Sequence, residues 1–517
     1  MPNTIDMLKI TKTFTQDGYF SEYLPPSFSL SKNQNAANLF NDSTPISNKN
    51  DLAEPISFSM SRFKKDGSRR TIYVPELCSY VSAVKVMTGK NLISDLITSL
   101  TSNVSFSPLL QASGELTRHE RDYMSTTSEE AVGLEDVALT YVPNVLKKLK
   151  LAKGAKKILC LDISNFYGNI YTHLLPAIKL GYEDAELQYK AQRANNTDPV
   201  ISDDYRKYVE LDEAVRNMNG ARTNGLLAGT MISQFLAEAL LSRIDIELKS
   251  EKINYVRYVD DYEVFIYDES QTERIKSIVE NTLRKYFLAL NEEKTVIVEF
   301  PYYLVENLKK IYEGYSNREL SDEEIMKLFN CYFRLEQEGV KGAIRFLVKS
   351  ISSDLKPKSK GIFTTYLINT LVNDSRSMVK TCELLIAQKS KIDIQKHDIE
   401  IIKNLLLQHL NCGNDLEVLW LLYLLKKLKV RRLSAELSRK IIYSNNDLAI
   451  VMLMEEYQIT TKMINECKTH AKSWLLCYQL FLRNHLTKSE FETKSKIKHN
   501  IFFYVKLKRE GFSFYHA

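Results

Sequence analysis

The apolar positions between residues 155 and 300 change their period along the chain, from that of strands to that of helices and back. Runs of apolar, β-branched or aromatic residues predict strands, and four such runs occur: Ile158–Ile163, Tyr255–Val259, Tyr262–Tyr267 and the end of Leu290–Phe300. Two helices are predicted among them, because helical spacing follows a glycine-containing turn at Gly225 and returns over Gln271–Tyr286. The order is strand, helix, two strands, helix, strand.

The pattern outside this stretch is mainly helical. Residues 80–150 read as helices joined by polar loops, Tyr182–Asn219 reads as a helical insertion, and little strand signal follows Tyr302. In the last two hundred residues, predicted helix starts recur at similar intervals, at Asn373, Asn414 and Asn446. Asparagine is a good N-cap, and Asn414-x-x-Glu417 resembles a capping box. These intervals predict paired-helix repeats in a HEAT-like array, in which Trp420 and Trp474 serve packing.

Length and composition bound the class of protein. A chain of 517 residues predicts two or more domains, and we place the boundary between 1–300 and 301–517. The content of 44% hydrophobic and 26% charged residues is typical of a soluble protein. We expect a cytoplasmic protein without a membrane partner, because no apolar stretch approaches about 20 residues and no signal peptide is recognisable. Seven scattered cysteines predict free thiols, and the net charge of +6 permits a polyanionic partner.

The hairpin predicted around Asp260 and Asp261 carries two adjacent carboxylates at its tip. Two negative charges this close repel each other unless a cation neutralises them, and hard oxygen ligands suit Mg²⁺ or Mn²⁺. The alternative is an ordinary hairpin with an Asp-Asp turn. A third carboxylate, Asp162, interrupts the apolar run Ile158–Ile163. A charge in a buried strand is costly unless it is paired or metal-bound, so Asp162 is either a metal ligand or a salt-bridged core residue.

Basic residues and glycines supply two further candidate features. Asp66-Gly67 predicts a hairpin that gathers four cations, which are Lys64, Lys65, Arg69 and Arg70. Lysine and arginine together suit a triphosphate, and the alternative is a solvated basic hairpin. Gly225 and Gly229 precede the first of the two predicted helices and permit unusual backbone angles and close approach of a ligand.

The order of these elements is the ferredoxin-like arrangement, and their contents resemble the palm of reverse transcriptases over roughly residues 55–300. Tyr258-Val-Asp-Asp261 is similar to the YxDD hairpin, and Asp162 to the first metal-binding aspartate. Gly225–Ser233 resembles the start of the nucleotide-pocket helix, and Leu290–Thr295 the late palm lysine motif. Lys64–Pro75 looks like the fingers ribbon that closes over the incoming triphosphate.

This resemblance implies a nucleotidyltransferase that uses two Mg²⁺ or Mn²⁺ ions. Asp162 and Asp260 would hold the ions with Asp261 assisting, and Lys294 is the candidate proton donor to pyrophosphate, or else a surface lysine after a turn. The resemblance also implies a set of residues that bind the dNTP, which are Lys64, Lys65, Arg70, Tyr167, Gly225 and Gly229. Tyr167 occupies the steric-gate position, which favours deoxynucleotides, or else it is an aromatic core residue.

Two departures from the family pattern concern template and primer. The usual Leu-Pro-Gln-Gly reads Leu226-Leu-Ala-Gly229, so Ala228 lacks the amide that touches the nucleotide. No primer-grip motif or compact basic thumb is recognisable after Phe300. In these respects the chain resembles the abortive-infection reverse transcriptases of bacteria and prophages. That resemblance implies protein-primed, template-independent DNA synthesis in anti-phage defence, a single-stranded DNA product attached to the protein, and a homo-oligomer.

Two other functions remain open at this point. One is an RNA-templated reverse transcriptase of retron or intron type, and the other is an inactive palm retained as a nucleic-acid-binding scaffold. The intact carboxylates argue against the scaffold, since a binding module needs no buried acidic trio. Among 29 tyrosines the priming residue is not identified by the sequence, and Tyr19, Tyr23 and Tyr515 are named only as candidates.

Overall fold

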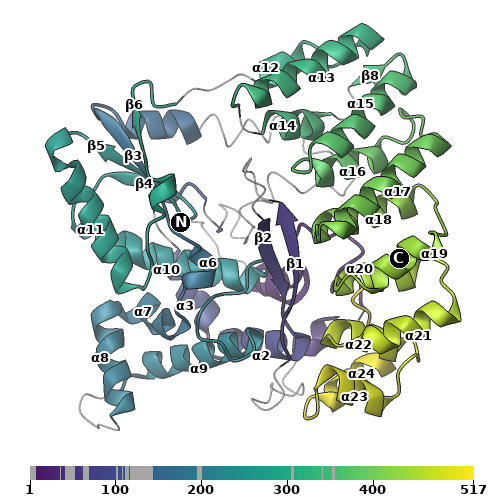
Figure 1. Ribbon diagram of the computed structural model, residues 1–517. Coiled ribbons are helices and arrows are strands. Elements are labelled where there is room, and N and C mark those ends of the chain that lie inside the picture. Colours follow the sequence, from purple (N-terminus) through teal and green to yellow (C-terminus); the bar gives the residue numbers. More distant parts are fainter. Residues whose placement is uncertain are drawn as a thin grey trace.

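The computed structural model describes most of the chain. The described residues are 7–34, 36–40, 53–61, 69–100, 103–107, 109–110, 116, 144–194, 201–303, 308–340, 342–351 and 355–517. Figure 1 shows the palm sheet on one side, a two-stranded ribbon in the middle and a long series of helices on the other side.

The centre of the first half is a four-stranded antiparallel sheet. Its strands are β3 (Lys157–Asp162), β4 (Tyr255–Tyr258), β5 (Asp261–Ile266) and β6 (Val296–Glu299), in the spatial order β4-β5-β3-β6. Two helices connect them, α10 (Met231–Ser250) and α11 (Thr272–Lys285). This is the strand order of a ferredoxin-like sheet, so the arrangement predicted for the palm is confirmed.

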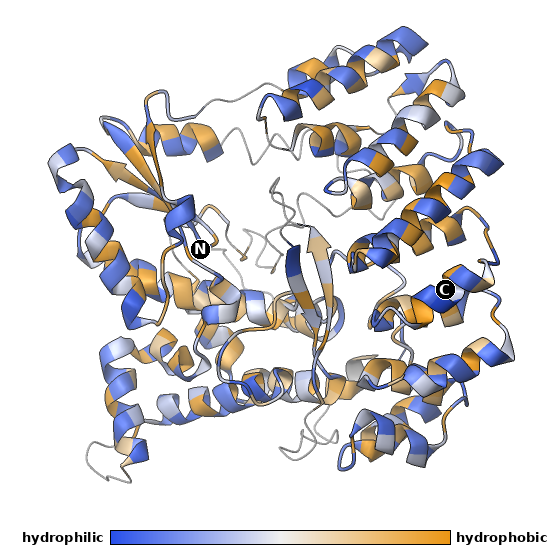
Figure 2. Cartoon of the chain, viewed as in Figure 1, coloured by the Kyte–Doolittle hydropathy of each residue, from blue (hydrophilic) through white to orange (hydrophobic). Residues whose placement is uncertain are grey.

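Alternate residues of the strands face two different cores, as the period of two requires. Leu159 and Leu161 belong to the main hydrophobic core together with the buried residues of α10, whereas Ile158 and Phe265 join Phe106 in a small second core. Figure 2 shows the strands and α10 as largely hydrophobic and the outer helix α11 as largely hydrophilic. The sheet therefore lies between two apolar layers, and its loops carry the polar chemistry.

The fingers-like part of the chain surrounds the palm. Its ribbon pairs β1 (Ile56–Ser61) with β2 (Arg69–Val74) in antiparallel register, and its predicted Asp66-Gly67 turn lies outside the described residues. Further elements of this half are α1 (Met7–Lys12), a π-helix (Thr13–Asp17), η2 (Ala36–Phe40), α2 (Leu77–Gly89), α3 (Leu92–Ser99), helical residues 144–151, α6 (Phe166–Asn169), η4 (Thr172–Leu174), α7 (Leu175–Leu180), α8 (Tyr182–Arg193), α9 (Asp203–Met218), η5 (Glu269–Gln271) and η6 (Glu292–Lys294). The helical insertion predicted over Tyr182–Asn219 is confirmed as α8 and α9.

The described residues of the second half are mainly helical and include a short parallel strand pair, β7 (Glu319–Leu320) and β8 (Lys356–Pro357). Its helices are α12 (Leu308–Glu313), α13 (Asp322–Gln337), α14 (Ala343–Ser350), α15 (Lys360–Asn373), α16 (Met378–Ala387), α17 (Lys396–Asn411), α18 (Asp415–Lys427), α19 (Ala435–Ile442), α20 (Asp447–Glu456), α21 (Thr461–His470), α22 (Trp474–Leu482), α23 (Lys488–Ser495) and α24 (Ile501–Arg509). Helices α16, α18, α20 and α22 pack one on the next, and α17, α19 and α21 form a second row. The HEAT-like identity of this array stays a prediction.

The three predicted helix starts in this array have different outcomes. Asn446 is an N-cap as predicted, because the Ala449 N–H donates to its side chain at 3.0 Å. The prediction at Asn373 is wrong, since this residue ends α15 and α16 begins only at Met378. Asn414 precedes α18, but the capping box is wrong because its amide pairs with the ring of His409 instead.

The N-terminal segment packs against the last helices. The Trp420 indole N–H donates to the Tyr23 carbonyl at 2.7 Å, and the rings of Phe28 and Tyr515 lie 5.0 Å apart. Trp420 and Trp474 are both 1% exposed, which confirms their predicted packing role. These contacts join the two halves, and the domain boundary at residue 300 stays a prediction. Across the described parts of the chain, we find no helix with the length and apolar character needed to span a membrane.

Candidate active site at the carboxylate hairpin

Three aspartates lie at one end of the two central strands. Asp162 ends β3, and in the strand register it stands directly opposite Asp261, which begins β5. Asp260 lies in the turn between β4 and β5, and its carbonyl accepts a hydrogen bond from the Ile163 N–H at 3.2 Å. The strand pairing thus brings residues 162 and 260–261 together, although about a hundred positions separate them in the sequence.

Burial and the neighbouring carboxyl groups raise the pKa of Asp260 and of Asp261. Loss of hydration, then the charge of Asp260 and a hydrogen bond with Asp162, raises the pKa of Asp261 to about 7. Loss of hydration and the charge of Asp162 also raise the pKa of Asp260, while the positive charges of Arg70 and Lys294 oppose that rise. The cluster therefore carries more negative charge than its own surroundings stabilise.

The turn that presents Asp260 has an unusual backbone. Val259 has a φ of 53°, which is strained for a β-branched residue. Its N–H donates to the Ser107 hydroxyl oxygen at 2.7 Å, and its carbonyl accepts from the Arg257 guanidinium at 3.3 Å. Both backbone groups of the strained residue are thus held from outside the turn, which fixes the direction of the neighbouring carboxylates.

A second cluster of charges lies beneath the hairpin, and the sequence reasoning missed it. Arg257 is fully buried and donates to Glu238 at 2.8 and 2.9 Å and to Asp245 at 2.9 and 3.1 Å. The Tyr255 hydroxyl donates to Asp245 at 2.9 Å. Burial alone would lower the pKa of Arg257, but the charges of Glu238 and Asp245 raise it above its ordinary value. The sequence carried a signal for this cluster: Glu238 and Asp245 are seven positions apart, so they lie on one face of the apolar helix α10.

Lys294 lies at the site, as the resemblance implied. It closes the short helix η6 (Glu292–Lys294), and its ammonium group forms an ion pair with Asp162. The Asn291 N–H donates to the Asp162 carbonyl at 2.7 Å, which fixes the segment beside β3. Lys294 therefore balances one of the carboxylates, and its role as a proton donor stays a prediction.

The two described arginines of the ribbon separate. Arg70 is exposed on β2, and its charge acts on Asp260. Arg69 instead pairs with Glu417 of α18 at 2.5 Å, so the prediction that both arginines join one cationic cluster is wrong. Lys64 and Lys65, the other two predicted clamp residues, lie outside the described residues.

Three residues of the predicted nucleotide pocket are described, Tyr167 and the two glycines. Tyr167 lies half-buried in α6, and its carbonyl accepts from the Leu226 N–H at 2.8 Å. Gly225 and Gly229 have φ angles of 94° and 115°, which confirms the unusual backbone angles expected there. A Cβ at Gly229 would stand 2.5 Å from the side chain of Ile72. The close approach expected from a ligand at Gly229 is therefore made by the protein's own β2 strand.

The carboxylates fit hard divalent ions by their chemistry. Among the residues that the structure describes, no three carboxylate, imidazole or thiol groups converge into a ready metal site. Asp162 and Asp261 nevertheless stand opposite each other on paired strands. The hydrogen bond between their carboxyl groups requires that one of them is protonated, and a bound cation could neutralise both instead. An all-oxygen set of ligands is what Mg²⁺ and Mn²⁺ prefer. Asp162, Asp260 and Asp261 are thus the residues that could hold such ions.

The three tyrosines named as candidate primers are all buried. Tyr19 is 0% exposed, Tyr23 6% and Tyr515 2%. The Tyr19 hydroxyl donates to the Pro75 carbonyl at 2.6 Å, and the Tyr515 hydroxyl donates to Glu456 at 2.8 Å. The hydroxyls of Tyr19 and Tyr515 are thus bonded within the protein, and Tyr23 lines a small pocket beside α16 and α18.

One protein family matches the part of the chain that contains these carboxylates. Residues 112–305 match the family model described as reverse transcriptase (RNA-dependent DNA polymerase). A similar solved structure is telomerase from Candida albicans with a fragment of telomeric RNA, which is 15% identical with a TM-score of 0.27. The match covers 70% of this chain and only 63% of the telomerase chain. Apo telomerase from Candida tropicalis is 13% identical over 88% of this chain and 69% of its own, with a TM-score of 0.30. No curated protein matches the sequence. The three carboxylates lie within the residues that match this reverse transcriptase family model.

Proposed function

We propose that the chain is a DNA polymerase of the reverse transcriptase superfamily that adds dNTPs by two-metal catalysis. The observation that carries this proposal is the meeting of Asp162, Asp260 and Asp261 at one end of the central strands, with Lys294 and Arg70 beside them. In a structural acidic cluster each charge would have its partner in the protein, whereas here the pKa values of Asp260 and Asp261 are raised.

Each residue has a role in this proposal. Asp162 and Asp260 hold the ions, with Asp261 assisting; bound ions supply charge neutralisation at the reacting phosphate and lower the pKa of the attacking hydroxyl. Arg70, together with Lys64 or Lys65, binds the triphosphate. Lys294 leaves Asp162 and donates its proton to the departing pyrophosphate.

The ring of Tyr167 excludes nucleotides that carry a 2′-hydroxyl, so dNTPs are the substrates. The turn Leu226–Gly229 lies beside Tyr167, because the Leu226 N–H donates to the Tyr167 carbonyl. This supports a position for the sugar of the nucleotide next to the Tyr167 ring. Replacement of Tyr167 by a smaller residue is expected to admit ribonucleotides.

The proposal includes synthesis that is primed by the protein and independent of a template. Ala228 supports it, because a methyl group cannot replace the amide that aligns a nucleotide with a template. A helical array, in place of a compact basic thumb, supports it as well. By its resemblance to the abortive-infection enzymes, we further propose a homo-oligomer that acts in anti-phage defence, with single-stranded DNA attached covalently to the chain.

The decisive experiment is to purify the full chain, digest it and sequence any attached DNA, before and after incubation with dNTPs and Mg²⁺. Random sequence attached to a peptide supports the proposal, and that peptide identifies the priming residue. Protein that carries no adduct after incubation contradicts protein priming. The Asp260→Ala variant is the control, because its adduct should be lost.

A second candidate function is RNA-templated reverse transcription, which the description of the matching family model favours. The same sequencing experiment with an added primed RNA tests it, because a templated enzyme yields DNA complementary to that RNA. The third hypothesis is an inactive scaffold. It predicts that cells with the Asp260→Ala variant show the same phenotype as cells with the wild-type protein.

A further inference from the structure

The β1–β2 ribbon is attached to the rest of the chain on two sides. On the palm side, the Tyr73 N–H donates to the Ala228 carbonyl at 2.8 Å, and Ile72 fills the space over Gly229. On the other side, the Ser59 N–H donates to the Asp415 carboxylate at 2.8 Å, and the Ser59 hydroxyl donates to a carbonyl of the loop before α18 at 2.9 Å. The ribbon thus bridges the nucleotide-pocket turn and the helical array.

The strongest link to the array is the ion pair between Arg69 and Glu417. The guanidinium donates to the two carboxylate oxygens of Glu417 at 3.0 and 2.5 Å, in the two-pronged geometry that makes such pairs strong and directional. It also donates to the carbonyl of Ser59 at 3.2 Å. The Glu417 side chain is only 3% exposed, so water cannot replace Arg69 as its partner without the loss of this packing.

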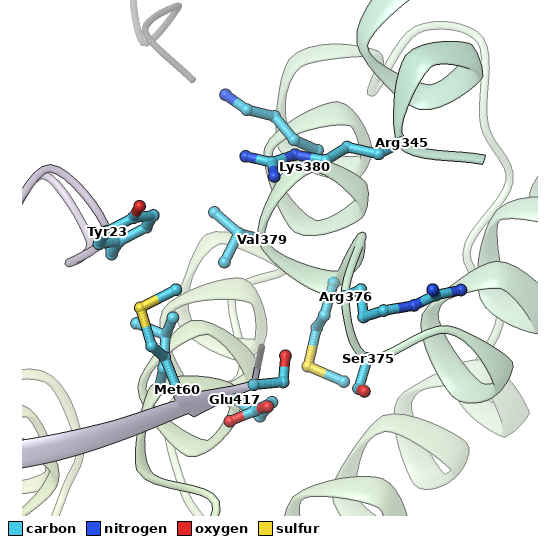
Figure 3. A pocket seen from close by; sticks show the side chains of 11 residues that line it. Tyr23, Met60, Arg345, Ser375, Arg376, Val379, Lys380 and Glu417 are labelled. Atoms are coloured by element: carbon cyan, nitrogen blue, oxygen red, sulfur yellow. The ribbon is translucent and has the colours of Figure 1, made fainter. Parts of the chain in front are cut away.

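The surroundings of Glu417 show that the ribbon enters the array. Met60 of β1 and Glu417 of α18 line the same small pocket as Val379 and Lys380 of α16. Figure 3 shows Met60 and Glu417 at the base of this pocket and Val379 facing them. The contact between the ribbon and the array is therefore a packed interface, of which the ion pair is one part.

Arg69 and Arg70 are neighbours on one strand, so their side chains leave opposite faces of the ribbon. Arg69 faces the array, and Arg70 acts by its charge on Asp260. Because β2 is a paired strand with fixed register, a shift at Arg69 is transmitted to Arg70 through one peptide unit.

We propose that Arg69 is a positioning residue, which through its ion pair with Glu417 holds the triphosphate-binding face of the ribbon over the carboxylates. The helical array is then the support of the nucleotide clamp, and the clamp is held in place by α18. This inference rests on the proposed function, because it assumes that Arg70 meets a triphosphate.

The test compares dNTP incorporation by full-length Arg69→Lys, Glu417→Gln and wild-type protein. Arg69→Lys keeps the charge but loses the fork, and Glu417→Gln keeps the size but loses the charge. We expect each variant to raise the KM for dNTPs by about tenfold, since small misplacements of binding groups have effects of this size or larger. kcat should stay within about twofold of wild type, because the carboxylates themselves are unchanged. The double variant Arg69→Glu with Glu417→Arg exchanges the two charges, and its KM for dNTPs should lie closer to the wild-type value than that of either single variant.

The matched control is Arg483→Lys, because Arg483 makes a similar two-pronged pair with the buried Glu455 elsewhere in the array. It should lower the melting temperature about as much as Arg69→Lys and leave the KM unchanged. Equal KM values for Arg69→Lys and wild type, with only the melting temperature lowered, would overturn the inference. Equilibrium binding of dATP in Ca²⁺ distinguishes a failure of this inference from a failure of the proposed function. Wild-type protein that neither binds dATP nor incorporates dNTPs contradicts the proposed function itself.

Discussion

Two clusters of charge lie on either side of the same hairpin, and they differ in how far the protein completes them. Beneath the turn, Arg257 satisfies Glu238 and Asp245 with four short hydrogen bonds in a fully buried network. At the tip, Asp162, Asp260 and Asp261 lie close together: Lys294 pairs with Asp162, and the pKa values of Asp260 and Asp261 are raised although the charges of Arg70 and Lys294 oppose the rise at Asp260.

This difference separates structure from chemistry. A buried cluster whose members satisfy one another fixes the fold, because each charge has its partner in the protein. A cluster of like charges remains unfavourable until something outside the protein joins it. The turn of the hairpin connects the two clusters, because Arg257 of the buried cluster also donates to the carbonyl of Val259, which precedes Asp260.

The largest expected effect concerns the tip. Asp260→Asn or Asp162→Asn should lower dNTP incorporation by about 10³-fold or more, equivalent to about 4 kcal/mol, because a ligand of the ions is lost. Incorporation of labelled dNTPs under single-turnover conditions measures this loss. The exposed Glu273→Gln on α11 is the control and should be fully active. Normal incorporation by Asp260→Asn would show that these carboxylates are not the ligands.

The next effect concerns the cluster beneath the turn. Arg257→Ala should destabilise the protein by about 3–5 kcal/mol, because Glu238 and Asp245 remain buried without their partner. Urea unfolding followed by circular dichroism measures it. Replacement of all three residues together, as Arg257→Met, Glu238→Leu and Asp245→Leu, should recover most of the stability. If the triple variant is as unstable as Arg257→Ala, the unpaired charges are not the cause.

A third effect is the pH dependence of stability without divalent ions. The pKa of Asp261 is about 7 in the folded protein against an ordinary value of 3.8. The folded state therefore binds more protons between these values, and stability should fall as the pH rises from about 4 through 7. Melting curves in EDTA should show this fall in wild type and a smaller one in Asp261→Asn. Mg²⁺ at pH 8 should raise the melting temperature of wild type more than that of the variant, and equal shifts would contradict the comparison.

The smallest expected effect concerns the turn that joins the clusters. Ser107→Ala removes the acceptor of the Val259 N–H and should destabilise the protein by about 1 kcal/mol. Because the direction of Asp260 depends on this turn, dNTP incorporation should fall as well, though less than in Asp260→Asn. Ser99→Ala is the control, because the Ser99 hydroxyl donates to the Asp95 carbonyl within α3, away from this turn. A variant with lowered stability and unchanged incorporation would mean that the turn keeps its shape without Ser107.

Much of the palm could be predicted from the sequence. The strands that carry Asp162, Asp260 and Asp261 were recognisable because side chains along a strand alternate with a fixed period and because acids rarely interrupt such runs. The same local signals placed Lys294 after a turn and the glycines before α10. Local signals failed at Asn373, which ends α15. At Asn414 they predicted the helix start correctly but not the capping hydrogen bond, which its side chain does not make.

The contacts between distant segments could not be predicted in this way. Arg69 and Glu417 are 348 positions apart, and no period or motif relates them. Gly229 suggested the approach of a ligand, whereas the neighbour is Ile72 of another strand. The reason is physical: periodicity and capping depend on residues within a few positions, so the sequence alone carries the strands, the helices and the chemical nature of the acids. Which buried charge finds a partner in the protein, and which is left for a ligand, depends on packing that only the folded chain creates.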